Sequence, residues 1–393
     1  MTPKAPRCNE HIILASGQFG LLLQALKNLG FEVLGPTLRE DAIVYGRVAS
    51  SKDLPEAWTD EQEGGKYRLK RREDSALFGY SVGPATWKKF LFPPVSRLWK
   101  AERSSNGHFQ IVPEEHQPPK YAFVGVRACD IQAVAILDKV FLKGPYVDAA
   151  YQLRRANVFI VAVNCTQPGG TCFCTSMGSG PKATAGYDLA LTEVLKNGDH
   201  HFVVQVGTEA GANLLARIPH EVASDAQVAF AESIVAEASQ QMGRTLNVDG
   251  IKELFYRNSE SPRWDLLANR CLSCANCTLV CPTCFCSTVE DVTDLTGLHA
   301  ERTRKWDSCF TTDFSYIHGS SVRATTRSKY RQWITHKLAY WQDQFGSSGC
   351  VGCGRCITWC PVGIDITEEV RALREGESRA GTRERRATHD SHA

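Results

Sequence analysis

The N-terminal part of the sequence alternates short, continuous apolar runs with segments of helical spacing. The run in YAFVGVRACD leads into IQAVAILDKVF, whose apolar positions follow the period of a helix. NVFIVAVNC and HFVVQVGTEAG are two further apolar runs, and a helical pattern, ANLLARI, follows the second. Such runs between helices are typical of a sheet with a parallel core that is covered on both faces. We therefore predict an α/β domain over residues 1–245.

The pattern changes after about residue 246, where the strand signal weakens and helical spacing dominates. We predict a second, α-helical domain over residues 246–375, with two cysteine-rich stretches among its helices. Residues 376–393 are polar and contain few bulky apolar side chains, so they predict a disordered tail. Within the first domain, the highly charged segment 56–75 predicts a loop with one short strand.

Composition excludes several classes of function. With 43% hydrophobic and 22% charged residues, the chain of 393 residues is an ordinary globular sequence. Its net charge of +2 provides no basic field for nucleic acid or a membrane surface. No apolar run approaches the length of about 18 residues that spans a bilayer, and the N-terminus lacks the apolar core of a secretory signal. We therefore expect a cytoplasmic protein whose sixteen cysteines bind metal rather than form disulfides.

Eight cysteines repeat the spacing C-x2-C-x2-C-x3-C-P, which is typical of ferredoxins that bind two [4Fe-4S] clusters. In this pattern three cysteines wrap around one cluster, and the fourth, which precedes a proline, reaches the other cluster. The predicted ligands of cluster 1 are Cys271, Cys274, Cys277 and Cys360, and those of cluster 2 are Cys350, Cys353, Cys356 and Cys281. Zinc is the alternative, but zinc sites usually use paired C-x2-C units without this proline-ended spacing.

The two motifs are separated by 68 residues, more than a compact two-motif ferredoxin contains. The separation predicts a helical, ferredoxin-like dicluster domain with long helices between the motifs. The bulky residues at the end of this insert, among them Tyr330, Trp333 and Trp341, are expected to pack around a cluster and exclude water.

A third metal site is predicted in the α/β region. Its candidate ligands are Cys129, Cys165, Cys172 and Cys174. The first two follow predicted strands, so they would lie at the carboxyl edge of the sheet, where open α/β folds bind ligands. The other two lie on the Gly-rich loop TQPGGTCFC, which permits close approach. A third [4Fe-4S] cluster would fit such a set, and the alternative is that the thiols are small buried hydrophobic residues. We assign no role to Cys284, Cys286 and Cys309.

The sequence predicts no catalytic residues. It contains neither a G-x-G-x-x-G motif nor a Walker A loop, and its eleven histidines form no H-x-x-x-H pair. The chain is therefore expected to carry electrons rather than to bind a nucleotide or transform a substrate.

The cysteine motifs and their surroundings resemble the beta subunit of cytoplasmic sulfhydrogenases, the NAD(P)-linked nickel–iron hydrogenases of group 3b. The stretches that carry the resemblance, over about residues 80–365, are GVRACDIQAVAILDKVF, NCTQPGGTCFC, CLSCANCTLVCPTCFC, RTRKWDSC and CVGCGRCITWCP. The resemblance implies an electron-transfer subunit that works beside a flavin-containing NAD(P) subunit, a small iron–sulfur subunit and a large nickel–iron subunit.

Two other functions remain open from the sequence. The A subunit of anaerobic sulfite reductase shares the layout of motifs, so the same set of clusters would also suit electron transfer to a sirohaem protein. A free-standing ferredoxin-like carrier is the other alternative, although such a carrier needs only the C-terminal third of this chain.

Overall fold

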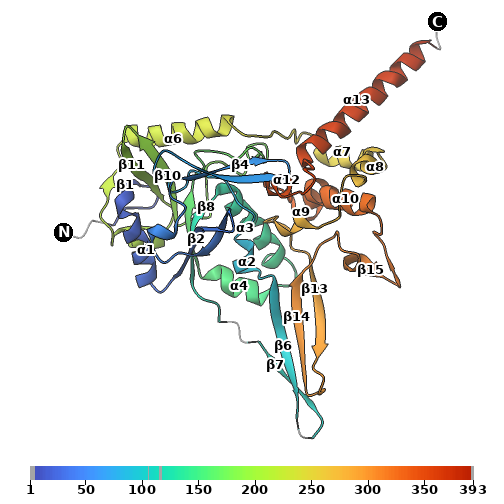
Figure 1. Ribbon diagram of the computed structural model, residues 1–393, viewed down its shortest axis with the longest axis horizontal. Helices are drawn as coiled ribbons and strands as arrows, with labels where there is room; N and C mark the ends of the chain where they lie inside the picture. The colour runs from blue at the N-terminus through green and yellow to red at the C-terminus, as the bar shows by residue number, and fades with distance from the viewer. Residues whose placement is uncertain (1–4, 105, 115–116, 391–393) are drawn as a thin grey trace.

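The computed structural model describes residues 5–104, 106–114 and 117–390, with side chains described as far as residue 378. An eight-stranded sheet lies at the centre of the N-terminal region, in the strand order β12-β1-β11-β10-β9-β8-β2-β3 (Figure 1). Its strands are β1 (His11–Ala15), β2 (Glu32–Arg39), β3 (Ala42–Arg47), β8 (Tyr121–Val126), β9 (Val158–Val163), β10 (Leu189–Lys196), β11 (Asp199–Val206) and β12 (Glu221–Val222).

The predicted parallel core is confirmed, because β10, β9, β8 and β2 pair in parallel. Antiparallel strands flank it on both sides: β11, β1 and β12 on one, β3 on the other. The region is therefore a mixed, sheet-rich structure, and the prediction of an α/β domain holds only in part. Antiparallel strands buried on both faces have the same continuous apolar pattern as parallel ones, so the sequence did not distinguish them.

Helices cover both faces of this sheet, as its burial pattern predicts. On β8, Ala122 and Val124 join the core that contains the helices α1 (Phe19–Asn28) and α5 (Glu209–Leu215), whereas Phe123 joins the core on the other side. That second core contains α3 (Ala128–Phe141) and α4 (Ala149–Ala156), and α6 (Asp225–Gln240) packs on β10 and β11. Successive side chains point to opposite faces, as in any strand.

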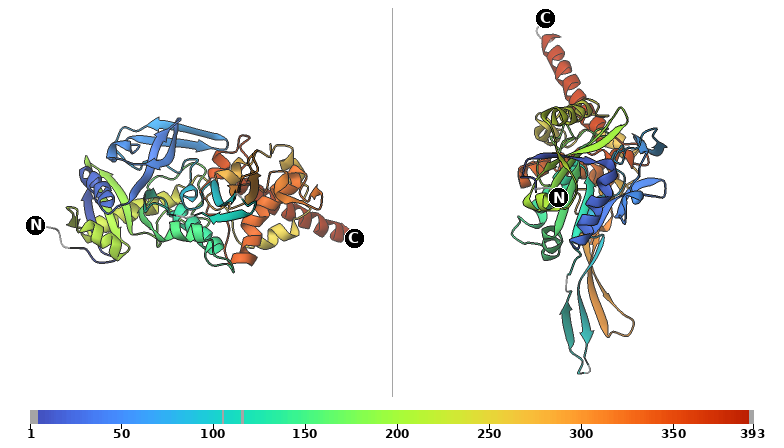
Figure 2. Two further views of the ribbon diagram at one scale, coloured as in Figure 1. Left: turned by 90° about the horizontal axis from the view of Figure 1, so that it is seen from below. Right: turned by 90° about the vertical axis from the view of Figure 1, so that its left-hand side faces the viewer.

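A second sheet joins the two parts of the chain. It has the order β13-β14-β6-β7 and consists of β6 (Val95–Arg103), β7 (Phe109–Pro113), β13 (Ser287–Thr293) and β14 (His299–Trp306). Figures 1 and 2 show it as an arm that projects from the body of the molecule. The expectation that helices dominate after residue 246 is wrong here, and the pairing of β6 with β14 crosses the predicted boundary at 245. Strand β13 is mostly exposed and β14 is mostly half-buried, and both consist largely of polar residues, so they lack the apolar alternation that identifies a strand in the sequence.

Apart from these strands and a short hairpin of β15 (Tyr316–Ile317) and β16 (Ser320–Ser321), the C-terminal region consists of helices and cysteine loops. Its helices are α7 (Ile251–Arg257), α8 (Arg263–Ala268), α9 (Asn276–Leu279), α10 (Thr326–Thr335), the π-helical segment η4 (His336–Tyr340), α11 (Trp341–Phe345), α12 (Arg355–Thr358) and α13 (Ile366–Asp390). They enclose a core that contains Trp264, Trp333 and Ile357. Helix α13 includes residues 376–390, where the sequence predicts a disordered tail, and residues 391–393 lie outside the described part.

Smaller elements connect the two regions. The segment 56–75 forms a hairpin of two paired strands, β4 (Trp58–Glu63) and β5 (Lys66–Arg71), rather than a loop with one strand. The tip of this hairpin reaches the second cysteine motif, where the N–H of Gly65 donates to the carbonyl of Ile357 at 3.1 Å. The short helix α2 (Lys88–Leu91) also contacts the cysteine loops. Within the described residues, every helix is too short or too polar to cross a bilayer.

Candidate metal centre

The two cysteine motifs fold in the same way. Ser273 and Ala275 in the first motif have φ angles of 51° and 67°, and Gly352 and Gly354 in the second have φ angles of 63° and 74°. In each loop a peptide N–H donates to the first thiol of the motif: that of Ser273 to Cys271 Sγ and that of Gly352 to Cys350 Sγ, both at 3.4 Å. The repeated backbone points successive thiols toward a common space, as the predicted clusters require.

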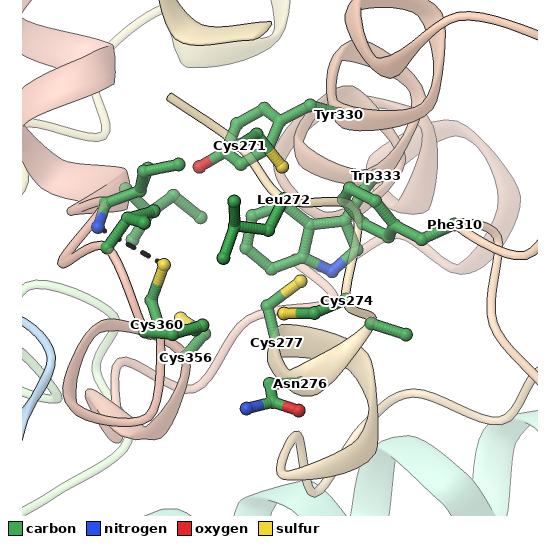
Figure 3. A pocket seen from close by; sticks show the side chains of 15 residues that line it. Cys271, Leu272, Cys274, Asn276, Cys277, Phe310, Tyr330, Trp333, Cys356 and Cys360 are labelled. Carbon is green, nitrogen blue, oxygen red and sulfur yellow. Dashed lines mark hydrogen bonds between the residues drawn. The ribbon is translucent and has the colours of Figure 1, made fainter. Parts of the chain in front are cut away.

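The first pocket contains the first predicted ligand set. Its lining includes Cys271, Cys274, Cys277 and Cys360, together with Cys356. Figure 3 shows these thiols beside the rings of Phe310, Tyr330 and Trp333. Tyr330 and Trp333 are each 3% exposed, so aromatic side chains form a dry wall, as the insert predicts. The thiol of Cys274 is exposed, and the pocket therefore reaches the surface on that side.

The second pocket contains the second predicted set, Cys281, Cys350, Cys353 and Cys356. Cys281 comes from the first motif, whereas Cys360 of the second motif lies in the first pocket. The structure thus groups the eight thiols as crossed ligation requires, and the iron that each thiol binds stays a prediction. Cys356 lines both pockets, so the two sites are immediate neighbours.

The thiols fit an iron–sulfur cluster chemically. The first pocket is lined by five thiols and the second by four, with few competing oxygen or nitrogen ligands, which suits iron–sulfur chemistry. Burial raises the pKa of the Cys350 thiol to about 12 and that of Cys356 well above its usual range. Since metal binds the thiolate, loading of the second pocket must release protons from these buried groups.

A buried lysine, Lys337, lies at the second pocket. Its Nζ donates to Cys281 Sγ at 3.0 Å, to Thr283 Oγ1 at 2.9 Å and to the carbonyl of Gly349 at 3.4 Å. Burial opposes the charge of this ammonium, but the neighbouring Cys281, Cys284 and Cys350 outweigh burial and raise the pKa of Lys337. The sequence does not reveal this residue, because a lysine in a polar helical pattern is typical of a solvated face.

A second buried lysine, Lys88, fixes the loop after the first motif. It extends from α2 and donates to the carbonyls of Cys281 and Cys284, at 3.0 and 2.8 Å, and its Nζ lies 3.9 Å from the ring centroid of Trp306. This contact between residues about two hundred positions apart fixes the backbone that presents Cys281 to the second pocket.

The third predicted set lies beside the second pocket. Cys129 is in the first turn of α3, Cys165 follows β9, and Cys172 and Cys174 lie on the loop between β9 and β10. Burial raises the pKa of Cys172 to about 12, and its Sγ lies 3.8 Å from the carbonyl oxygen of Cys353. Burial also raises the pKa of Cys174, and the neighbouring Cys165 and Cys172 raise that pKa further.

Four thiols therefore gather where the sequence predicts a third site, but a third metal site stays a prediction. Over the described ranges, no three Cys, His, Asp or Glu side chains meet closely enough to hold a single metal ion.

The three cysteines without a predicted role lie close to the second pocket. Cys284 forms a hydrogen bond with Cys281. Cys286 forms one with Cys309, which lowers the pKa of Cys286 to about 7. Their spacing alone gives no signal of a site, because the residues come from two strand-flanking segments that only the folded chain brings together.

Comparison with known proteins agrees with this geometry. The sequence profile of the 4Fe-4S dicluster domain matches residues 270–364, which include all eight motif cysteines. Sulfhydrogenase 2 subunit beta of Pyrococcus furiosus is 33% identical over 293 residues, which are 74% of this chain and 83% of that protein. The chain belongs to the sulfhydrogenase subunit beta family. The resemblance drawn from the motifs is thus confirmed, although no solved structure matches the chain. As a member of the sulfhydrogenase beta family with a dicluster domain, it is an iron–sulfur, electron-transfer subunit of the hydrogenase type.

Proposed function

We propose that this chain relays electrons between a flavin-containing NAD(P) subunit and a nickel–iron hydrogenase module, through two [4Fe-4S] clusters with crossed ligation. The observation that supports it most is the pair of adjacent pockets, each of which contains one predicted set of four thiols and both of which Cys356 lines. When bound, the clusters supply one-electron redox chemistry. The chain itself contributes the thiolates, the N–H groups that donate to sulfur, and the walls that exclude water.

The two pockets suit different ends of a relay. Cys274 is exposed and its neighbour Leu272 is 63% exposed, so the first pocket lies close to a surface that a partner subunit can approach. The second pocket is deeper, between Phe173, Val351 and Lys337. Electrons that enter at the first pocket would therefore pass inward to the second.

The third set of thiols extends the proposed relay. We assign a third [4Fe-4S] cluster to Cys129, Cys165, Cys172 and Cys174, because Cys172 Sγ lies 3.8 Å from the carbonyl oxygen of Cys353, a predicted ligand in the second pocket. A relay that continues in this direction would leave the dicluster region through the N-terminal sheet and reach a second partner there. The proposal includes the cytoplasm as the location, since all three sites need reduced thiols.

The test is anaerobic co-purification of the chain with its native partners, followed by subunit and metal analysis. The proposal expects a flavin-containing subunit, a small iron–sulfur subunit and a large subunit with nickel. Recovery of a sirohaem protein in place of the nickel subunit would assign the chain to a sulfite-reducing complex instead. Recovery of the chain alone, with full iron content, would favour a free-standing carrier.

A further inference from the structure

Lys337 is buried without a carboxylate partner among its hydrogen bonds. The residue is 5% exposed, and the three groups that accept from its Nζ are a thiol, a hydroxyl and a carbonyl. A buried ammonium is costly unless an opposite charge lies nearby. The group that Lys337 contacts directly and that can supply this charge is the thiolate of Cys281, 3.0 Å away.

The backbone holds this lysine firmly in place. Lys337 belongs to the π-helical segment η4, and its carbonyl accepts from the N–H of Gly349 at 2.8 Å and from Ser348 Oγ at 3.3 Å. Insertions of π-helix into α-helices are rare and occur frequently at functional sites. The side chain and the backbone of one residue thus contact the loop that leads into Cys350, which fixes the ammonium against the second pocket.

The first pocket has no equivalent charge. As far as the structure describes the chain, every residue that lines it is uncharged. The second pocket is lined by Lys337 and by Arg355, whose guanidinium pairs with Asp130 at 2.9 Å. Both loops provide the same N–H donor to their first thiol, at 3.4 Å. Lys337 therefore places a cation in direct contact with a predicted ligand thiol of the second pocket, and none of the described residues that line the first pocket does so.

We propose that Lys337 raises the reduction potential of the second cluster above that of the first. The inference rests on the proposed function, since it requires a cluster in each pocket. Reduction adds negative charge to a cluster, so a cation and an N–H···S hydrogen bond stabilise the reduced form. The first electron to enter the pair therefore resides on the deeper cluster, which gives inward transfer a favourable free energy. Lys337 acts only through the electrostatic effect of its ammonium group on the cluster and is not itself oxidised or reduced.

The experiment is an anaerobic redox titration of the purified chain, followed by EPR, with three substitutions. In the wild type the two clusters should titrate at separate potentials. Lys337→Met should lower the higher of the two reduction potentials by at least about 59 mV, which corresponds to a tenfold change in the equilibrium constant of a one-electron reduction. The lower potential should stay unchanged. Lys337→Arg keeps the charge and should stay near the wild type. Lys139→Met is the matched control, because Lys139 donates to Phe345 O and Ser347 Oγ and to no thiol.

Iron content separates the failure of this inference from that of the proposed function. A wild-type chain that contains clearly fewer than about eight irons would contradict the two-cluster relay itself. Full iron content with unchanged potentials in Lys337→Met would overturn the role of Lys337. If Lys337→Met does not load its clusters, Cys350→Ala provides the second measurement. That variant should lose the signal with the higher potential, and loss of the signal with the lower potential would overturn the inference.

Discussion

At the scale of single residues, one thiol of each motif lies in the pocket of the other motif. Cys281 and Cys360 each lie in the pocket that the other motif's first three cysteines line. Each is held there by its own contacts: Lys337 donates to the thiol of Cys281, and the N–H of Ile364 donates to that of Cys360 at 3.3 Å. These contacts make the crossed arrangement a property of the fold rather than of the spacing alone.

We predict that Cys281→Ala removes the cluster of the second pocket and leaves that of the first, so iron content falls by about four atoms per chain. EPR of the reduced variant measures which cluster remains. Cys8→Ala is the control, because Cys8 is exposed and lies outside both pockets. Loss of the first cluster with the second intact would contradict crossed ligation.

The third set of thiols is tested in the same way. If Cys129, Cys165, Cys172 and Cys174 bind a third cluster, the wild type should contain about twelve irons rather than about eight. The double variant Cys172→Ser, Cys174→Ser should then lose about four. Analysis must include zinc, since four thiols also suit that ion. A double variant that keeps all of its iron and zinc would show that the site does not exist.

A strict spacing carries residue-level information that a single sequence can reveal, although the cluster that each cysteine binds stays a prediction. The eight motif cysteines group in the structure as their spacing predicts. Lys337 and Lys88 were missed because their role depends on burial by segments distant in sequence. A buried lysine and an exposed one look alike in a polar helical pattern, so only the folded chain separates them.

At the level of elements, close packing of two loops places the second pocket against the third set of thiols. A Cβ added at Gly352 would lie 2.6 Å from the carbonyl oxygen of Phe173, and one at Gly354 would lie 2.4 Å from that of Thr171. Both glycines also have positive φ angles. The second motif therefore needs glycine where the first tolerates Ser273 and Ala275, because no backbone packs so closely on the first loop.

We predict that Gly352→Ala lowers stability by roughly 2–5 kcal/mol and weakens cluster binding in the second pocket, since it adds both backbone strain and a steric clash. Anaerobic thermal unfolding and iron content measure the two effects. Gly346→Ala is a matched control: Gly346 has a φ of 64° but no atom within 4 Å of an added Cβ. It should lose only about 1–2 kcal/mol and keep its iron. Equal effects of the two substitutions would contradict a role for this packing.

The elements that the sequence did not predict are those that depend on distant partners. The parallel core was predictable because its strands are buried on both faces and read as apolar runs. The arm of β6, β7, β13 and β14 was not, because none of its strands is buried on both faces and β6 pairs with β14 across the predicted domain boundary. Local patterns carry little information about strands whose stability comes from a ladder formed between remote segments.

At the scale of the whole molecule, the cysteine sites follow one another as the proposed relay requires. One pocket lies near the surface, the next lies deeper, and a further set of thiols continues toward the N-terminal sheet. The family to which the chain belongs is that of a hydrogenase subunit, and the profile match covers the dicluster domain. The account therefore predicts that flavin and nickel chemistry resides in partner subunits.

The most direct test is cofactor analysis of the chain expressed alone and purified without oxygen. Iron, sulfide, flavin and nickel are measured on one sample, together with hydrogen oxidation and NAD(P)+ reduction. The account predicts at least about eight irons with matching sulfide, neither flavin nor nickel, and neither activity. Stoichiometric flavin in the single chain, with reduction of NAD(P)+, would contradict it and would place the diaphorase function in this subunit.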